Sequence, residues 1–211
     1  MNEPFALEHP LPEAQGNAEN EHFPTPLPLA AAIYQAVLDL HWVRSSLGPF
    51  CILEPGCGDG APFLDAARVS PGCARCGVDI RDVADMGTGV KVFGNVDYLG
   101  TIPFPGPFDL VITNPPFSLA QEFVERSMQL VHPFGLVAML LQTGIEASKK
   151  RIEFWEQHPF LVKFNIVPRP RFIEGGDMRE YAAYVWPGPG LAASLRQLGR
   201  AWSEVRTLKW R

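Results

Sequence analysis

Residues 51–60 read Cys-Ile-Leu-Glu-Pro-Gly-Cys-Gly-Asp-Gly, and this stretch decides the fold. Its first residues are mostly apolar and are typical of a buried strand, while Gly56 and Gly58 predict a tight turn at the end of that strand. The residues that follow, 61–69, have a helical composition. A strand, a glycine-rich turn and a helix in this order indicate the start of a nucleotide-binding α/β domain. A tight turn that binds no ligand is the alternative interpretation.

Carboxylates on both sides of the turn narrow the choice of ligand. The turn also matches the looser Gly-x-Gly-x-x-Ala pattern of dinucleotide-binding proteins, but Glu54 and Asp59 would repel a pyrophosphate. The same charges would attract a sulfonium cofactor that carries an ammonium group. We therefore expect such a cofactor to bind at Glu54, Pro55, Gly56, Gly58 and Asp59.

Two further acidic residues follow at suitable positions. Asp79 lies near the end of an apolar run, 77–80, about 20 residues after the glycine turn, where an acid can accept hydrogen bonds from both ribose hydroxyls. Asp97 follows a third short strand, 90–93, and could accept a hydrogen bond from an adenine amino group. Each acid alone could equally be a solvated loop residue, but their order beside the turn favours an adenosyl site.

The tetrapeptide Asn114-Pro115-Pro116-Phe117 follows another apolar run, 110–113. Two consecutive prolines cannot continue a strand ladder, so we expect the strand to stop there. The turn would then present a carboxamide acceptor, a rigid backbone carbonyl and an aromatic ring. These groups suit the binding of a planar amino group. A proline turn capped by asparagine is the alternative interpretation.

These motifs together resemble those of the class I methyltransferases that use S-adenosyl-L-methionine. The order of the motifs is similar to the gamma arrangement of the N6-adenine DNA methyltransferases, and the region 148–186 is similar to small phage-encoded adenine methyltransferases. The resemblance covers roughly residues 23 to 186. The matching stretches are Phe23-Pro24-Thr25-Pro26-Leu27, Glu54-Pro55-Gly56-Cys57-Gly58, Asp79, Asp97-Tyr98-Leu99 and Asn114-Pro115-Pro116-Phe117.

The resemblance implies a Rossmann-like α/β fold, with a doubly wound, mostly parallel sheet that ends in an antiparallel edge hairpin. It implies that S-adenosyl-L-methionine is the cofactor. The residues that it adds to the cofactor site are Thr25, Pro26, Ile80, Tyr98 and Asn114. It also makes Asn114, Pro115, Pro116 and Phe117 the catalytic residues, with no metal ion.

The loop 168–180 is basic and aromatic, and in the family the corresponding loop borders the target base. We expect Phe172 to pack near the substrate and Arg169 or Arg171 to contact phosphate. The alternative is that Phe172 belongs to the core and that the two arginines are simply solvated.

The substrate that the resemblance favours is adenine N6 in DNA. Methylation of adenine in RNA or of a protein glutamine remains open, although the glutamine subgroup usually has Tyr where this chain has Phe117. A cofactor-binding regulatory subunit without activity is the non-enzymatic alternative. We expect 1–22 to be a flexible lead and 23–211 to form one methyltransferase domain with no separate target-recognition domain.

Composition agrees with a globular enzyme of the cytoplasm. The chain has 211 residues, of which 46% are hydrophobic, and no apolar run reaches the length of a membrane span. The net charge of −5 is unevenly spread, because residues 1–117 carry 5 basic and 14 acidic residues whereas 118–211 carry 13 and 9. The basic half could therefore offer a positive rim to a nucleic acid. The four cysteines include one Cys-x-x-Cys without a nearby histidine, so we predict no zinc site.

Three expectations concern individual elements. A helix should run from Thr25, as its N-cap, to about residue 41. A second helix, 148–158, should direct Ile152 and Trp155 into the core. The last two predicted strands, 160–167 and 181–186, should form the antiparallel edge hairpin.

Overall fold

One sheet of eight strands organises the molecule, with the order β3-β2-β1-β4-β5-β7-β6-β8. The computed structural model describes residues 23–40, 50–84, 89–104, 106–172, 179–199 and 203–211, so the expected flexible lead and the tip of the 168–180 loop lie outside the described residues. The strands are β1 (Cys51–Pro55), β2 (Ala74–Val78), β3 (Val90–Phe93), β4 (Phe108–Thr113), β5 (Val131–Gln142), β6 (Val162–Val167), β7 (Tyr181–Pro187) and β8 (Glu204–Lys209).

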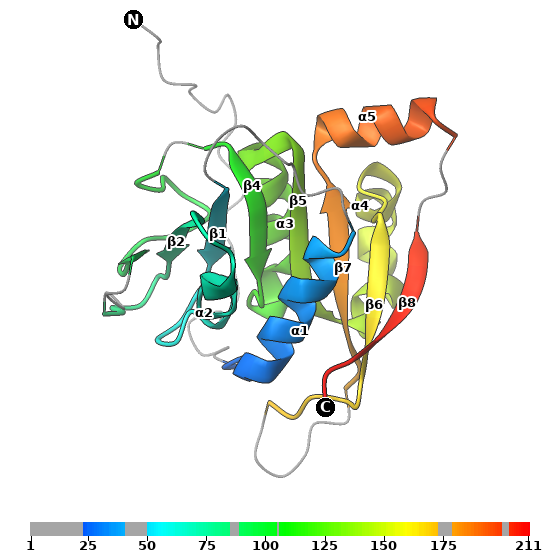
Figure 1. The fold of residues 1–211 in the computed structure, drawn as a ribbon. Coiled ribbons are helices and arrows are strands. Elements are labelled where there is room, and N and C mark those ends of the chain that lie inside the picture. The colour runs from blue at the N-terminus through cyan, green and yellow to red at the C-terminus, as the bar shows by residue number, and fades with distance from the viewer. Residues whose placement is uncertain (1–22, 41–49, 85–88, 105, 173–178, 200–202) are drawn as a thin grey trace, which may run out of the picture.

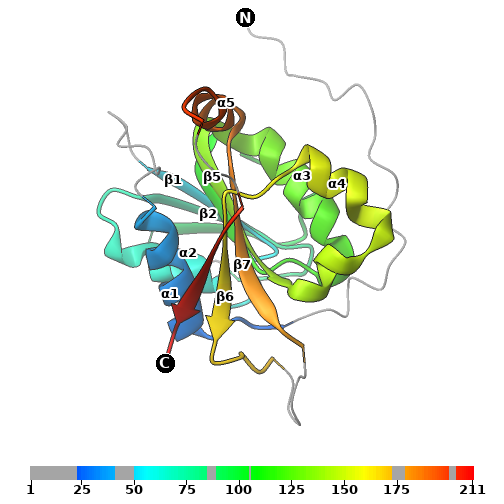
Figure 2. The same cartoon turned by 90° about the vertical axis from the view of Figure 1, so that its right-hand side faces the viewer.

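Helices cover both faces of this sheet. Helices α1 and α2 lie on one face, α3 and α4 lie on the other, and α5 lies across one end (Figures 1 and 2). None of the helices in the described ranges combines the length and the apolar character that crossing a membrane requires. The helices are α1 (Leu27–Leu38), α2 (Pro62–Ala66), α3 (Ala120–Leu130), α4 (Ile152–Gln157) and α5 (Pro189–Gln197), with the 3-10 turns η2 (Ala67–Val69), η3 (Phe117–Leu119), η4 (Thr143–Ala147) and η5 (Lys149–Arg151).

The pairing of the strands confirms the predicted fold class. Strands β1 to β5 pair in parallel, and β7 runs antiparallel between β5 and β6. Every residue of β4 is buried, because helices cover the sheet on both faces, and this explains the apolar run at residues 110–112. Two apolar clusters form the core, one on each face of the sheet.

The edge of the sheet differs from the prediction. The β6 and β7 pair is antiparallel as expected, but it is not the edge, because β8 pairs in parallel with β6. The indole of Trp210, just after β8, donates a hydrogen bond to the Pro168 carbonyl at 2.6 Å and is itself buried. This anchor holds a strand whose own residues are almost all exposed.

Two local predictions were wrong in detail. Helix α1 begins at Leu27 with Pro26 at the N-cap position and ends at Leu38, and the Thr25 side chain does not cap it. Its hydroxyl accepts a hydrogen bond from Asn114 instead. In the other helix, Ile152 is 57% exposed and Phe154 takes the buried position, whereas Trp155 is half-buried and packs against the core as predicted.

Candidate active site

A cavity of about 390 Å³ lies where the predicted motifs meet. Because β1, β2 and β4 are parallel, the segments that follow them emerge at one edge of the sheet, where α/β proteins bind ligands. The segment before α1 closes the cavity from the other side. The predicted residues that line it are Thr25, Glu54, Gly56, Gly58, Asp59, Asp79, Ile80, Asp97, Tyr98, Asn114 and Pro116.

The glycine turn after β1 has the backbone that its sequence predicts. Gly56 and Gly58 have φ angles of 61° and 62°, in the left-handed region where side chains are strained. The Gly58 N–H donates a 2.8 Å hydrogen bond to Asp79 Oδ2, which ties the turn to the end of β2. The turn therefore has a fixed shape that leaves its backbone open to the cavity.

Asp79 is buried at the cavity wall and is held by its neighbours. Its Oδ1 accepts hydrogen bonds from the backbone N–H of Arg81 at 2.9 Å and from Arg81 Nε at 3.0 Å. Arg81 also lines the cavity, and sequence analysis missed it. The sequence did contain a signal for Arg81, because an arginine two residues after an acid on an exposed loop can pair with that acid. The ion pair with Arg81 fixes the direction of the Asp79 carboxylate.

Glu54 lines the cavity but also has a structural role that was not predicted. Its Oε2 accepts hydrogen bonds from the backbone N–H groups of Phe63 and Leu64, at 3.1 and 2.9 Å, and so caps the start of α2. Burial raises the pKa of Glu54 well above its usual range, although the two backbone bonds oppose this shift.

We expect Glu54→Gln to remove a pH dependence of stability. Between the ordinary glutamate pKa of about 4.3 and the raised value, the folded state binds more protons than the unfolded state, so stability falls as pH rises. Glutamine cannot titrate, but its carbonyl can still cap α2. Urea unfolding of both proteins between about pH 4 and 8 measures the effect. The variant should gain stability relative to the wild type as pH rises, and a constant difference would contradict the assignment.

Asn114 sits between the cavity and the segment that precedes α1. Its Nδ2 donates two hydrogen bonds, to the Phe23 carbonyl and to Thr25 Oγ1, each at 3.1 Å. Its Oδ1 is buried, and no hydrogen-bond partner for it exists among the described residues. Buried acceptors are normally satisfied, so this oxygen marks a place where a donor from a ligand would fit.

Aromatic rings gather beside Asn114. Phe117 stacks on Phe23 with ring centroids 5.5 Å apart and lies 5.6 Å from Tyr181. Phe172 lies 4.8 Å from Tyr181 and 6.5 Å from Phe23 and packs on the core, and it is not among the residues that line the cavity. The sequence identified Phe23 only as part of a motif and did not predict that it stacks on Phe117.

The remaining predicted residues differ in how they are placed. Ile80 is 55% exposed at the cavity wall, whereas Tyr98 is buried and hydrogen-bonds Ser127 at 2.7 Å. Asp97 is exposed, and its Oδ1 accepts a hydrogen bond from the Leu99 N–H at 2.9 Å. Pro26, Pro55, Pro115 and Phe117 are close in sequence to lining residues but do not line this cavity themselves.

The two arginines that were predicted to contact phosphate lie outside the cavity. Arg169 and Arg171 are both exposed, and Arg169 lies 3.7 Å from a carboxylate oxygen of Glu180. Neither arginine is among the residues that line the cavity. In the described part of the chain, no cluster of His, Cys, Asp and Glu could hold a metal ion.

The fold, with its site at the carboxyl ends of the parallel strands, is that of the class I methyltransferases. No protein-family model matches the sequence, and a search of curated proteins gives no significant match. Many solved structures do match the fold. The three structures described next are 14 to 17% identical to this chain in sequence, so they show a similarity of fold alone.

A type I restriction-modification methyltransferase subunit from Streptococcus thermophilus is 16% identical, with a TM-score of 0.60 over 79% of this chain and 45% of that one. A Listeria monocytogenes protein assigned as a class I S-adenosylmethionine-dependent methyltransferase is 14% identical, with a TM-score of 0.64 over 89% and 68%. A Pyrococcus horikoshii protein assigned as an RNA methyltransferase is 17% identical, with a TM-score of 0.57 over 80% and 88%. The present chain thus matches less than half of the restriction subunit.

Proposed function

We propose that the chain is an S-adenosyl-L-methionine-dependent methyltransferase that acts on adenine N6 in DNA. The observation that carries this proposal is the buried Oδ1 of Asn114, an acceptor without a partner among the described residues. It belongs to a residue on the wall of an acidic cavity, directly after a buried parallel strand. The proposed relation to small phage adenine methyltransferases rests only on the motifs.

The cavity fits the proposed cofactor. S-adenosyl-L-methionine, when bound, supplies an electrophilic methyl group on a positively charged sulfur. The carboxylates that line the cavity complement this charge and that of an ammonium group. Asp79 lines the cavity and would accept hydrogen bonds from the ribose hydroxyls, and the exposed Ile80 would offer an apolar surface to the adenine ring.

Asn114 would prepare the target amino group. The lone pair of adenine N6 is delocalised into the ring and is therefore a poor nucleophile. If Asn114 Oδ1 and the Pro115 carbonyl accept its two hydrogens, the nitrogen becomes pyramidal and its lone pair points out of the ring plane. Because the proton becomes acidic only after methylation, no strong base is needed. Position and electrostatics then supply most of the acceleration.

Access to Phe117 requires a movement. An adenine in duplex DNA must be flipped out, at a cost of a few kcal/mol, before it can stack on an aromatic ring. Phe23 already lies against Phe117 with centroids 5.5 Å apart, which leaves no room for a third ring between them. We therefore expect the Phe23 ring to move aside when the base binds.

Incubation with tritium-labelled cofactor and separate pools of DNA, RNA and protein tests the proposal. Label in DNA, at N6-methyladenine after hydrolysis, is the expected result. Label in RNA or at protein glutamine would show a different substrate but the same reaction, methyl transfer from the cofactor. Cofactor binding without transfer to any pool would favour the non-catalytic regulatory subunit.

A further inference from the structure

A second cavity, of about 280 Å³, lies beside the catalytic turn and is not used by the mechanism above. The turn that carries Asn114 and Pro116 to the first cavity continues into Phe117 and Ala120, which line the second. The other walls come from the end of β5, from η4 and from η5. The lining residues are Phe117, Ala120, Leu141, Gln142, Gly144, Ile145 and Arg151.

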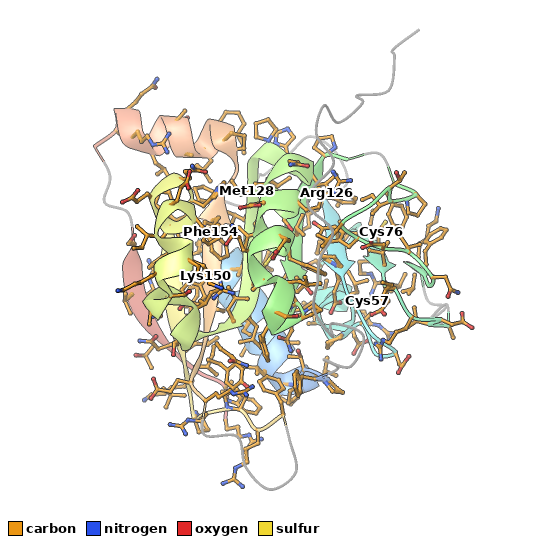
Figure 3. The ribbon with its side chains drawn as sticks, turned by 180° about the vertical axis from the view of Figure 1, so that it is seen from behind. Cys57, Cys76, Arg126, Met128, Lys150 and Phe154 are labelled. Atoms are coloured by element: carbon orange, nitrogen blue, oxygen red, sulfur yellow. The ribbon has the colours of Figure 1, made fainter. Side chains whose placement is uncertain are left out.

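The two cavities have opposite charge. Five acidic residues and one basic residue line the first cavity: Glu54, Asp59, Asp65, Asp79 and Asp97, with Arg81. Among the described residues, Arg151 is the only charged one that lines the second cavity, and none of them forms an ion pair with it. Lys149 and Lys150 precede it, and Lys150 projects on the face that α3 and α4 cover (Figure 3). The second cavity therefore suits an anionic group.

A nearby acid does not neutralise this charge. Glu146 belongs to η4, next to the cavity, but its Oε1 already accepts hydrogen bonds from Lys163 Nζ at 2.7 Å and from the Tyr184 hydroxyl at 2.6 Å. Lys163 thus balances Glu146, and the Arg151 guanidinium remains available to an anion.

The other lining groups suit a base rather than a bare anion. The Gln142 side chain offers a donor and an acceptor and has no hydrogen-bond partner in the part of the chain that the structure describes. Phe117 adds an aromatic surface, and Gly144 leaves open space, because a Cβ there would meet nothing within 4 Å. A cation, an amide and a ring around this small volume match one nucleotide.

We propose that the second cavity binds the nucleotide next to the target adenine, with Arg151 on its phosphate and Gln142 on the edge of its base. This inference rests on the proposed function and adds to it, because it places the first sequence contact within the methyltransferase domain. A glutamine amide can make paired hydrogen bonds to a base edge, and it gives the cavity a preference among bases.

Binding of a fluorescent random-sequence DNA duplex, titrated between about 50 and 200 mM salt, tests the role of Arg151. Arg151→Gln should weaken binding about tenfold at the lower salt concentration and reduce the slope of log K against log salt by about 1. The matched control is Lys91→Gln, which removes one exposed positive charge from β3 at the far edge of the sheet. It should leave binding nearly unchanged.

Gly144→Leu provides a second variant, because it fills the cavity without removing charge. It should weaken DNA binding and leave cofactor affinity intact. If the wild-type chain methylates DNA but Arg151→Gln behaves like Lys91→Gln, the inference is overturned and the proposed function stands. If the wild-type chain neither binds nor methylates DNA, both are overturned.

Discussion

Replacing Asn114 with Ala should lower the rate of methyl transfer at least about a thousandfold, which corresponds to roughly 4 kcal/mol. The substitution removes the one buried acceptor in the described site that has no partner, and no other side chain is placed to replace it. Cofactor affinity should change much less, because the acids on the opposite wall remain. Single-turnover transfer and calorimetric binding of the cofactor measure the two effects separately.

Thr25→Val separates catalysis from anchoring. Thr25 Oγ1 accepts one of the two hydrogen bonds from Asn114 Nδ2, so the valine variant weakens the anchor but keeps Oδ1 in place. We expect it to retain most of the transfer rate. If both variants lost the same activity, Asn114 would act only by holding the segment before α1.

Replacing Asp79 with Ala should weaken cofactor binding by about 1–3 kcal/mol, or roughly five- to a hundred-and-fiftyfold. The substitution removes the proposed ribose acceptor and also leaves the Gly58 N–H without its partner at the cavity wall. Unfolding free energy should therefore fall as well, by about 1–3 kcal/mol. Calorimetry and urea unfolding report the two losses.

Arg81→Gln is the control for Asp79. It removes the partner of the ion pair but leaves both carboxylate oxygens and the Gly58 bond in place. We expect cofactor affinity within a few-fold of the wild type. A loss as large as that of Asp79→Ala would mean that the ion pair, and not the carboxylate, shapes the site.

The fold class followed from short local signals. Gly56 and Gly58 have positive φ angles, which glycine adopts readily. Two glycines so close together in the sequence therefore predict a tight turn between β1 and α2. The apolar run of β4 ends at Thr113, because two prolines follow shortly after it. Such signals are contained in a few neighbouring residues, which is why sequence alone was enough to predict the fold class.

Contacts between distant segments were not predictable in this way. The Thr25 hydroxyl pairs with Asn114 rather than capping α1, and Phe23 stacks on Phe117, because the chain folds back over the cavity. The tail 205–210 was expected to pack on the sheet, but its pairing with β6 as strand β8 was not predicted, for a similar reason. Its sequence alternates weakly, and its place beside β6 depends on the anchor of Trp210. In each case the deciding partner lies far away in the sequence.

The two hydrogen bonds of Asn114 Nδ2 have a consequence for the polarity of the site. A carboxamide side chain can flip, so that its oxygen and its amino group exchange positions. The flipped amide would present donors to a substrate group that is itself a donor. The carbonyl of Phe23 and the hydroxyl of Thr25, residues 91 and 89 positions earlier, bind the amino end and so fix the orientation of the oxygen. The direction of the Asn114 carboxamide dipole is thus set by a segment outside the strand and turn that carry it.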